Sequence, residues 1–394
     1  MIGPFSIDMY LPGFPAIAKD LQTTIAEVQL SLASFFVGLS LGQLFSGPIT
    51  DRFGRKKPLY VGLGLYMLAS LACVFAPNVE TLIALRFVQA LGGSVGMVVS
   101  RAVVRDLYPP EEMAKIFSML MLVMGVAPII APSLGGILAS SVGWQAIFLT
   151  LVIISAITLL GMYLGLPETK PSDATISLKP VKVLHDYVKI VKNRQFLTYT
   201  LVSGISGAGM FAYISGSPFV FIELHRVPEA TFGIIFSANA FGLIMSGQLN
   251  RLALRRFTTV QIVKFVNALQ LIFGALLVVY SFTFWGGLPM LIGLIFCYMS
   301  MLGFLYPNSG ALAMAPFVRN AGAASALLGS LQFVISAVVA GLVSALDNGT
   351  ALPMTGAMAI CSLLVFLLLR IPKNSNKKVK RAVEMAQENE AALC

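Results

Sequence analysis

One carboxylate lies inside an apolar stretch close to the start of the chain. In the segment IDMYLPGFP, residues 7–15, the acid is Asp8, and the next charged residue is Lys19. The other acidic residues fall in polar segments, at the ends of apolar runs or in the tail. An ionised carboxylate in hydrocarbon is costly, so such a residue usually faces a wet cavity and pairs or takes up a proton. Asp8 is therefore the first candidate for chemistry, and Pro12 and Pro15 would bend the helix beside it.

A basic residue inside a later apolar run is the second candidate. Arg86 stands in LRFVQALGG, three residues before Gln89. A carboxylic acid poised between burial and a neighbouring cation can exchange a proton as its surroundings change. Arg86 would then tune Asp8. The alternative is that Arg86 extends its side chain to the nearby membrane surface.

The segment GPITDRFGRK, residues 47–56, contains more than a basic turn needs. Its defining residues are Gly47, Asp51, Arg52, Gly54, Arg55 and Lys56. Asp51 can lie at the positive N-terminus of a helix from the other half of the chain, and Arg55 can bridge it to Asp106. Such a latch would hold one side of the protein shut in one state and break in the other. A solvated loop that only sets topology is the alternative, but it leaves Asp51 unexplained.

The elements that must position these residues are membrane spans. Of the 394 residues, 57% are hydrophobic and 11% are charged, too few polar groups to cover a water-facing surface. Apolar runs of about 20 residues, the length that crosses a bilayer, recur along the chain. The net charge of +10 comes from short loops and the tail, so membrane topology explains it better than nucleic-acid binding. The four cysteines stand apart, which predicts no disulfide framework, no metal site and no cofactor.

The apolar runs predict an all-α polytopic protein with twelve transmembrane helices in two sets of six. The expected spans are 1–18, 28–49, 58–76, 81–104, 114–139, 143–166, 196–222, 230–250, 259–281, 286–314, 320–345 and 352–371. They predict an N-terminal six-helix bundle at 1–166, a cytoplasmic central loop at 167–195, a C-terminal bundle at 196–371 and a cytoplasmic tail at 372–394. The central loop can contain a helix on the membrane surface, or it can be a solvated linker.

Basic residues accumulate in alternate loops and set the orientation. The opposite side of the predicted bundle shows only Lys19 and Arg226. By the positive-inside rule, both termini and the central loop are cytoplasmic. The first span is short, because Met1 is only seven residues before Asp8 while a span needs about 20 residues, so we expect further residues upstream.

The two halves contain related segments. SFFVGLSLGQLFSGPITDRFGRK around Gln43 returns as SANAFGLIMSGQLNRLALRRFT around Gln248, an offset of 248 − 43 = 205 residues. This indicates parallel copies of one six-helix unit, a known arrangement of transporters. The same offset takes Asp8 to Tyr213, so the acid has no counterpart in the second half. Chance similarity between apolar helices is the alternative.

These motifs resemble those of the major facilitator superfamily. Residues 47–56 resemble its cytoplasmic signature loop, and Arg86-x-x-Gln89 resembles its fourth-helix motif, whose arginine faces the central cavity. The fifth span resembles the antiporter motif through Gly125, Pro128, Pro132, Gly135 and Gly136, although these small residues also suit ordinary helix packing. The segments at 6–17, 101–112 and 203–223 resemble the bicyclomycin and chloramphenicol resistance group of drug:proton antiporters.

The resemblance implies a multidrug efflux transporter of the bacterial inner membrane, without enzymatic activity, and we expect a monomer. One proton entering through Asp8 would drive one drug-like molecule outward. Residues expected to contact the substrate are Tyr10, Gln89, Met210, Phe211, Tyr213, Tyr298, Met301 and Asn308. A transporter of a small metabolite is the alternative. An intramembrane enzyme is disfavoured because Asp8 has no partner acid in any span.

Overall fold

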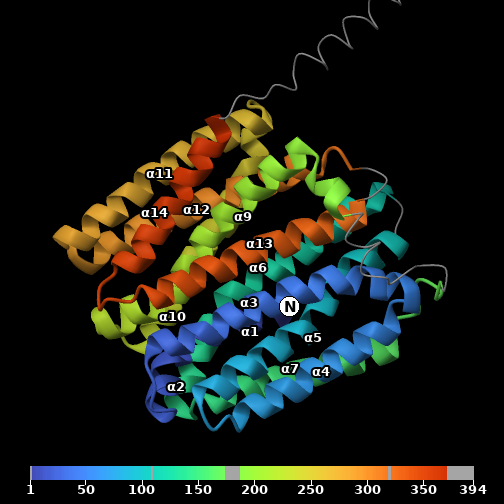
Figure 1. The fold of residues 1–394 in the computed structure, drawn as a ribbon, viewed down its shortest axis with the longest axis horizontal. Helices are drawn as coiled ribbons and strands as arrows, with labels where there is room; N and C mark the ends of the chain where they lie inside the picture. The colour runs from blue at the N-terminus through green and yellow to red at the C-terminus, as the bar shows by residue number, and fades with distance from the viewer. Residues whose placement is uncertain (1, 108–109, 174–186, 318–320, 371–394) are drawn as a thin grey trace, which may run out of the picture.

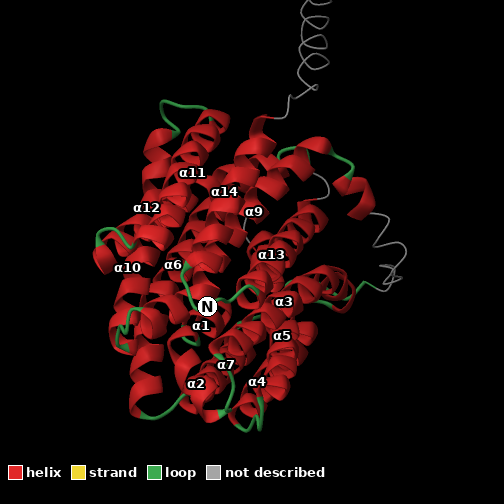
Figure 2. Ribbon diagram, turned by 60° about the vertical axis from the view of Figure 1, so that its left-hand side comes forward, coloured by secondary structure: helices red, strands yellow, loops and turns green. Residues whose placement is uncertain are grey.

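The computed structural model describes residues 2–107, 110–173, 187–317 and 321–370; the side chains of residues 101, 105, 110–125 and 321–322 lie outside the description. Every regular element in these ranges is helical (Figures 1 and 2). The first half contains α1 (Ile2–Asp8), the 3₁₀ helix η1 (Leu11–Gly13), α2 (Phe14–Asp20), α3 (Ile25–Phe53), α4 (Lys56–Val74), α5 (Val79–Leu107), α6 (Pro110–Ser141) and α7 (Gln145–Gly165). The second half contains α9 (Arg194–Pro218), the π-helix η2 (Phe219–Leu224), α10 (Glu229–Ala253), α11 (Thr259–Thr283), α12 (Gly287–Met314), α13 (Ala321–Ala345) and α14 (Leu352–Arg370).

The twelve predicted spans agree with these elements. Ten of the described helices are long and apolar enough to cross a membrane, and α6 adds the apolar segment Val126–Ser141. The first predicted span is the broken run α1–η1–α2. The tail at 372–394 and most of the predicted surface helix of the central loop lie outside the described residues.

Helix ends follow local sequence signals. α3 begins at a capping box, in which Thr24 and Glu27 each accept a hydrogen bond from the other's backbone N–H. α11 begins in the same way with Thr258 and Gln261. α3 ends at Gly54, whose φ of 82° is a conformation that favours glycine.

The helices form two bundles that meet along two contacts. In Figure 1 the helices of the first half occupy the lower part of the view, and α9, α11, α12 and α14 the upper part. Between them α3 packs against α13, and α6 packs against α10; we call these two contacts the seam. Within the halves, α3 packs on α5 and α10 on α12. Gln43 lies on α3 and Gln248 on α10, so the 205-residue offset relates helices that occupy equivalent places in the two bundles.

Neutral hydroxyl groups bond across the seam. The Oγ atoms of Ser40 on α3 and Ser330 on α13 are 2.9 Å apart. On the other contact, the Oγ atoms of Ser133 and Ser237 are 3.3 Å apart. Small side chains at these positions let the helices approach closely.

The distribution of side chains is that of a membrane protein. Large apolar residues such as Val61, Leu68 and Leu164 are 73%, 64% and 75% exposed. Polar Arg86 and Asn267, in contrast, are fully buried. Apolar groups face lipid and polar groups face the bundle interior, as hydrocarbon solvent requires.

Candidate functional site

The first span is broken directly after Asp8. α1 ends there, η1 follows at Leu11–Gly13, and α2 begins at Phe14. Pro12 and Pro15 have no N–H to donate to the carbonyls four residues earlier, those of Asp8 and Leu11. The helical hydrogen-bond ladder is interrupted at both places, so the two prolines leave Asp8 at the end of a short helix.

Asp8 is buried at this break, with 5% of its surface exposed. Among the side chains that the structure describes, none forms an ion pair or hydrogen bond with its carboxylate. α6 packs against α1 and η1, and Gly135 lies so close to the Met9 carbonyl that a Cβ would overlap its oxygen. Gly135 of the predicted antiporter motif therefore determines how closely α6 approaches the residue after Asp8.

Arg86 is fully buried on α5 and bonds to neutral groups. Its Nη2 donates to the carbonyl of Ser6 at 2.9 Å, and its Nη1 donates to Oε1 of Gln89 at 2.5 Å. Gln89 in turn donates to Oγ of Ser70 at 2.6 Å. Ser6 belongs to the last turn of α1, the partially negative end of a helix, so Arg86 caps the helix that ends at Asp8.

Aromatic rings enclose the Arg86 guanidinium. Its central carbon lies 4.2 Å from the ring centre of Phe35 and 4.4 Å from that of Tyr10. Such a desolvated cation–π contact contributes about 2 kcal/mol. No ion pair joins Arg86 to Asp8. The structure therefore does not contain the direct charge interaction through which Arg86 was expected to influence proton binding at Asp8. Arg86 instead bonds to the α1 backbone at Ser6, two residues before Asp8. Its full burial also excludes the alternative that its side chain extends to the membrane surface.

The residues expected to contact substrate fall into two groups. Five of them form hydrogen bonds with partners in their own bundle: Tyr10 to Ser31, Gln89 to Arg86 and Ser70, Tyr213 to Asn239, Tyr298 to the Met358 carbonyl, and Asn308 to Asn250. Phe211 instead contacts Phe36 of the other bundle, with ring centres 4.4 Å apart. Met210 and Met301 are half-buried against the same core. The structure therefore brings Phe211 to the boundary between the bundles.

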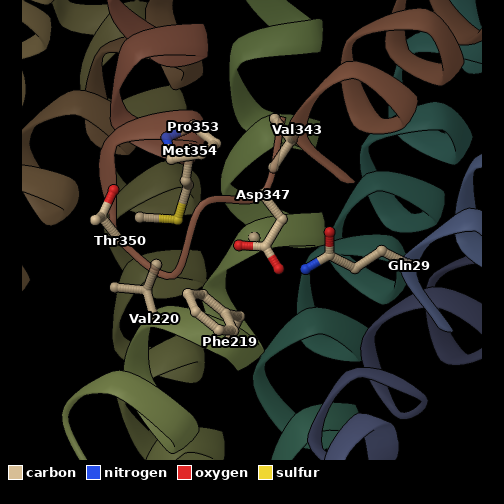
Figure 3. A pocket seen from close by; sticks show the side chains of 9 residues that line it. Gln29, Phe219, Val220, Val343, Asp347, Thr350, Pro353 and Met354 are labelled. Atoms are coloured by element: carbon tan, nitrogen blue, oxygen red, sulfur yellow. The ribbon is translucent and has the colours of Figure 1, made fainter. Parts of the chain in front are cut away.

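A small pocket lies between the halves, and none of these eight residues lines it. It contains about 220 Å³ of empty space, including the part open to solvent, and its lining includes Gln29 of α3, Phe219 of η2 and Met354 of α14. Figure 3 shows the Asp347 carboxylate facing the Gln29 side chain across it. Oε1 of Gln29 is buried without a hydrogen-bond partner in the described structure. Because its lining contains none of the predicted residues, the pocket is not assigned to them.

The residues of the 47–56 loop form a cluster around Arg55. Its Nε donates to Asp106 at 2.8 Å, its Nη1 donates to Asp51 at 3.0 Å, and the residue is 1% exposed. Burial lowers the pKa of Arg55, but its hydrogen bonds and charge interactions with Asp106 and Asp51 outweigh this and raise it. The guanidinium therefore stays charged. All three residues belong to the first half, and the hydrogen bonds and ion pairs described for Asp51 do not include the helix start of the other half that it was expected to face.

A segment after α7 completes this cluster, and no sequence motif indicated it. The Glu168 carboxylate accepts from the backbone N–H of Arg55 at 2.7 Å and of Lys56 at 3.1 Å, which caps α4. Lys170 Nζ donates to Asp51 at 2.8 Å. A Cβ on Gly54 would come within 3.0 Å of the Glu168 carboxylate, so this glycine is required by contact as well as by its φ. An acid two residues beyond a span looks like any loop residue.

We expect Glu168→Gln to loosen the 53–57 segment. The substitution removes a charge-assisted bond worth about 1.5 kcal/mol, which is about tenfold in the local opening equilibrium. Hydrogen–deuterium exchange of the Arg55 and Lys56 amides in detergent micelles measures it. Glu80→Gln, at an exposed carboxylate, is the matched control. Equal exchange in wild type and variant would contradict the capping role.

The predicted antiporter motif lines the α6–α10 contact of the seam. Pro128 and Pro132 lie inside α6, and Gly233 of α10 packs against the Pro132 carbonyl. Gly136 lies against the backbone of Glu229. Gly125 falls on the part of α6 whose side chains are outside the description.

Two bundles of spanning helices that meet along the seam, with a buried acid at a broken helix beside it, define a membrane transporter. Residues 1–341 match the family model of the Major Facilitator Superfamily, and the chain belongs to this superfamily. The resemblance inferred from the motifs is thus confirmed, as is the expectation of a transporter without enzymatic activity.

Curated relatives extend over nearly the whole chain. An uncharacterized MFS-type transporter YdgK of Bacillus subtilis (strain 168) is 37% identical over 374 residues, covering 92% of this chain and 90% of the relative. A bicyclomycin resistance protein homolog of Haemophilus influenzae is 31% identical over 378 residues, covering 96% and 95%. Multidrug resistance protein D of Escherichia coli (strain K12) is 30% identical over 379 residues, covering 94% and 91%.

Solved structures agree on the fold. The D-xylose-proton symporter superposes with a TM-score of 0.73 at 14% identity, covering 94% of this chain and 96% of that one. A bacterial homolog of the human lysosomal transporter Spinster, in an inward-facing conformation, gives 0.68 at 15% identity, covering 93% and 92%. These similarities establish the two-bundle architecture.

Proposed function

We propose that this transporter exports small hydrophobic or amphipathic drug-like molecules, such as bicyclomycin- or chloramphenicol-like compounds, in exchange for protons. The observation that carries the proposal is the buried carboxylate of Asp8, which has no described counter-charge and lies at a helix break beside the seam. A lone acid in such a place is neutralised by a proton in one state and must be hydrated when it is ionised. Relatives named for multidrug and bicyclomycin resistance support the substrate class.

The proposed cycle assigns a task to each part of the site. A proton binds Asp8 from outside the cell and leaves to the cytoplasm after the bundles rock about the seam. Arg86 holds the end of α1 in place, so that the Asp8 side chain keeps the same orientation. The Arg55 cluster stabilises one of the two arrangements of the cytoplasmic side.

The remaining assignments belong to the same proposal. The protein lies in a bacterial inner membrane as a monomer, with both termini cytoplasmic, residues 1–166 and 196–371 as the moving bundles, and 167–195 as the loop between them. Phe211, Met210 and Met301 form the adaptable apolar wall, because aromatic and methionine side chains repack around different shapes. Tyr10, Gln89, Tyr213, Tyr298 and Asn308 supply hydrogen bonds once the bundles separate.

Proteoliposomes with the purified chain test the function. A pH gradient, acidic on the side that corresponds to the periplasm, should drive chloramphenicol or ethidium into the acidic compartment. Each addition of drug should in turn cause protons to leave that compartment. Collapse of the gradient by an ionophore should stop the movement. Drug movement along with protons, or transport of a metabolite alone, would reject drug:proton antiport and favour a metabolite transporter.

A further inference from the structure

A buried polar pair joins the two helices of the second half that pack against the broken first span. Tyr213 of α9 and Asn239 of α10 are 0% and 1% exposed. Nδ2 of Asn239 donates to the Tyr213 hydroxyl at 2.9 Å, and the Tyr213 ring stacks on Phe236 with centres 5.4 Å apart. A phenol that accepts one bond still has its own hydrogen to donate. Within the described residues that hydrogen has no acceptor, and Oδ1 of Asn239 has no donor.

Asp8 lies just before the segment of the first span that packs against the helices of these two residues. η1, which follows Asp8 after two residues, packs against both α9 and α10. The Asp8 carboxylate acts electrostatically on the Tyr213 hydroxyl. A carboxylate without a described donor thus lies near a hydroxyl whose hydrogen is free.

The internal repeat also relates these two residues. The 205-residue offset that relates Gln43 to Gln248 takes Asp8 to position 213, because 8 + 205 = 213. Asp8 and Tyr213 therefore occupy matching positions in the first span of each bundle.

We propose that Tyr213, oriented by Asn239, is a positioning residue whose hydroxyl donates a hydrogen bond to Asp8 when Asp8 has lost its proton. The inference rests on the proposed role of Asp8 in proton coupling. Tyr213 keeps its own hydrogen throughout; the transported proton leaves Asp8 for water. Bonds to an ionised acceptor are about twice as strong as bonds between neutral groups. The attraction between the first span and the second bundle then depends on whether Asp8 carries its proton.

Other ionisable groups near Asp8 do not replace this contact. Around α1 and η1 these groups are Arg86 of α5, Glu229 in the first turn of α10, and the phenols of Tyr66 and Tyr10, which bond to Oγ of Ser6 and Oγ of Ser31. Arg86 bonds to the Ser6 carbonyl, and Glu229 lies beside Gly136 at the end of α6. Residues 126–141 of α6 include no ionisable side chain, and α7 has only Tyr163, which is 72% exposed.

The test is the pH profile of drug:proton exchange in proteoliposomes for Tyr213→Phe. Removing the hydroxyl destabilises ionised Asp8, so we expect the midpoint of the profile to move to higher pH by about one unit. Asn239→Ala should move it in the same direction by less, because the hydroxyl is no longer oriented. Tyr163→Phe, at an exposed residue of α7, is the control and should leave the profile unchanged.

Two results would overturn the inference. One is an unchanged midpoint in Tyr213→Phe with normal activity; the other is an equal loss at every pH together with weaker drug binding, which would make Tyr213 a substrate contact only. If Tyr213→Phe does not fold, Asn239→Ala alone decides by the same criterion. Failure of the proposed function is separate, since it would appear as retained proton coupling in Asp8→Asn.

Discussion

Asp8→Asn is expected to abolish proton-driven drug accumulation while leaving drug binding within a few-fold of wild type. The asparagine side chain has the same shape but cannot take up a proton at any pH of the experiment. The drug can still cross in both directions down its own gradient. Drug uptake into inverted membrane vesicles, with and without an imposed pH gradient, measures the loss, and equilibrium binding to the purified protein measures what remains.

The matched control is Glu80→Gln, which neutralises an exposed acid in the first turn of α5. It should retain wild-type accumulation. If Asp8→Asn instead accumulates drug at the wild-type rate under a pH gradient, Asp8 has no part in the coupling. A resistance panel of cells that express each variant provides the same comparison in living bacteria.

Arg86→Lys is expected to be almost as damaging, although it conserves the charge. A guanidinium donates in several directions from one plane, so Arg86 reaches the Ser6 carbonyl and Gln89 while lying between two rings. A lysine ammonium cannot reproduce this geometry and remains a buried, more strongly hydrated charge. We expect the variant to lose about 3 kcal/mol of stability, in the range found when a buried charge loses its partners, and to transport at least tenfold more slowly.

Thermal unfolding in detergent and drug exchange in proteoliposomes measure the two effects of Arg86→Lys. Arg251→Lys, at an exposed position near the end of α10, serves as the control and should behave as wild type. If Arg86→Lys has normal stability and normal exchange, then the cap on α1 is not needed, and the direction of Asp8 is fixed by other contacts.

The spans were predictable because a bilayer imposes the length of each apolar run. The cluster around Arg55 was also predictable, because Asp51 and Arg55 are four residues apart and Asp106 ends a span on the same side. The direction in which the Asp8 side chain points could not be predicted from the sequence. It depends on how α1 turns at its break, and that turn is set by Gly135 on α6 and Arg86 on α5, two contacts between helices distant in sequence.

Two further features could not be predicted from the sequence, for a different physical reason. Glu168 acts through its position after a helix end, where a carboxylate meets backbone N–H groups that no motif records. Asn239 is one of several polar residues in apolar helices, and only the fold shows that it faces Tyr213. Periodicity identifies which residues are inside a bundle, but the partner of each polar group inside depends on tertiary packing.

The neutral bonds of the seam also set an energy scale for the transport cycle. Each hydroxyl bond such as Ser40 to Ser330 has a net value of about 1 kcal/mol, and water can replace it when the bundles separate. Breaking a buried ion pair would cost about 3 to 5 kcal/mol instead. One proton that crosses a potential of 100 mV releases about 2.3 kcal/mol. The polar bonds of the seam are therefore weak enough for the energy of a single proton to open and close them.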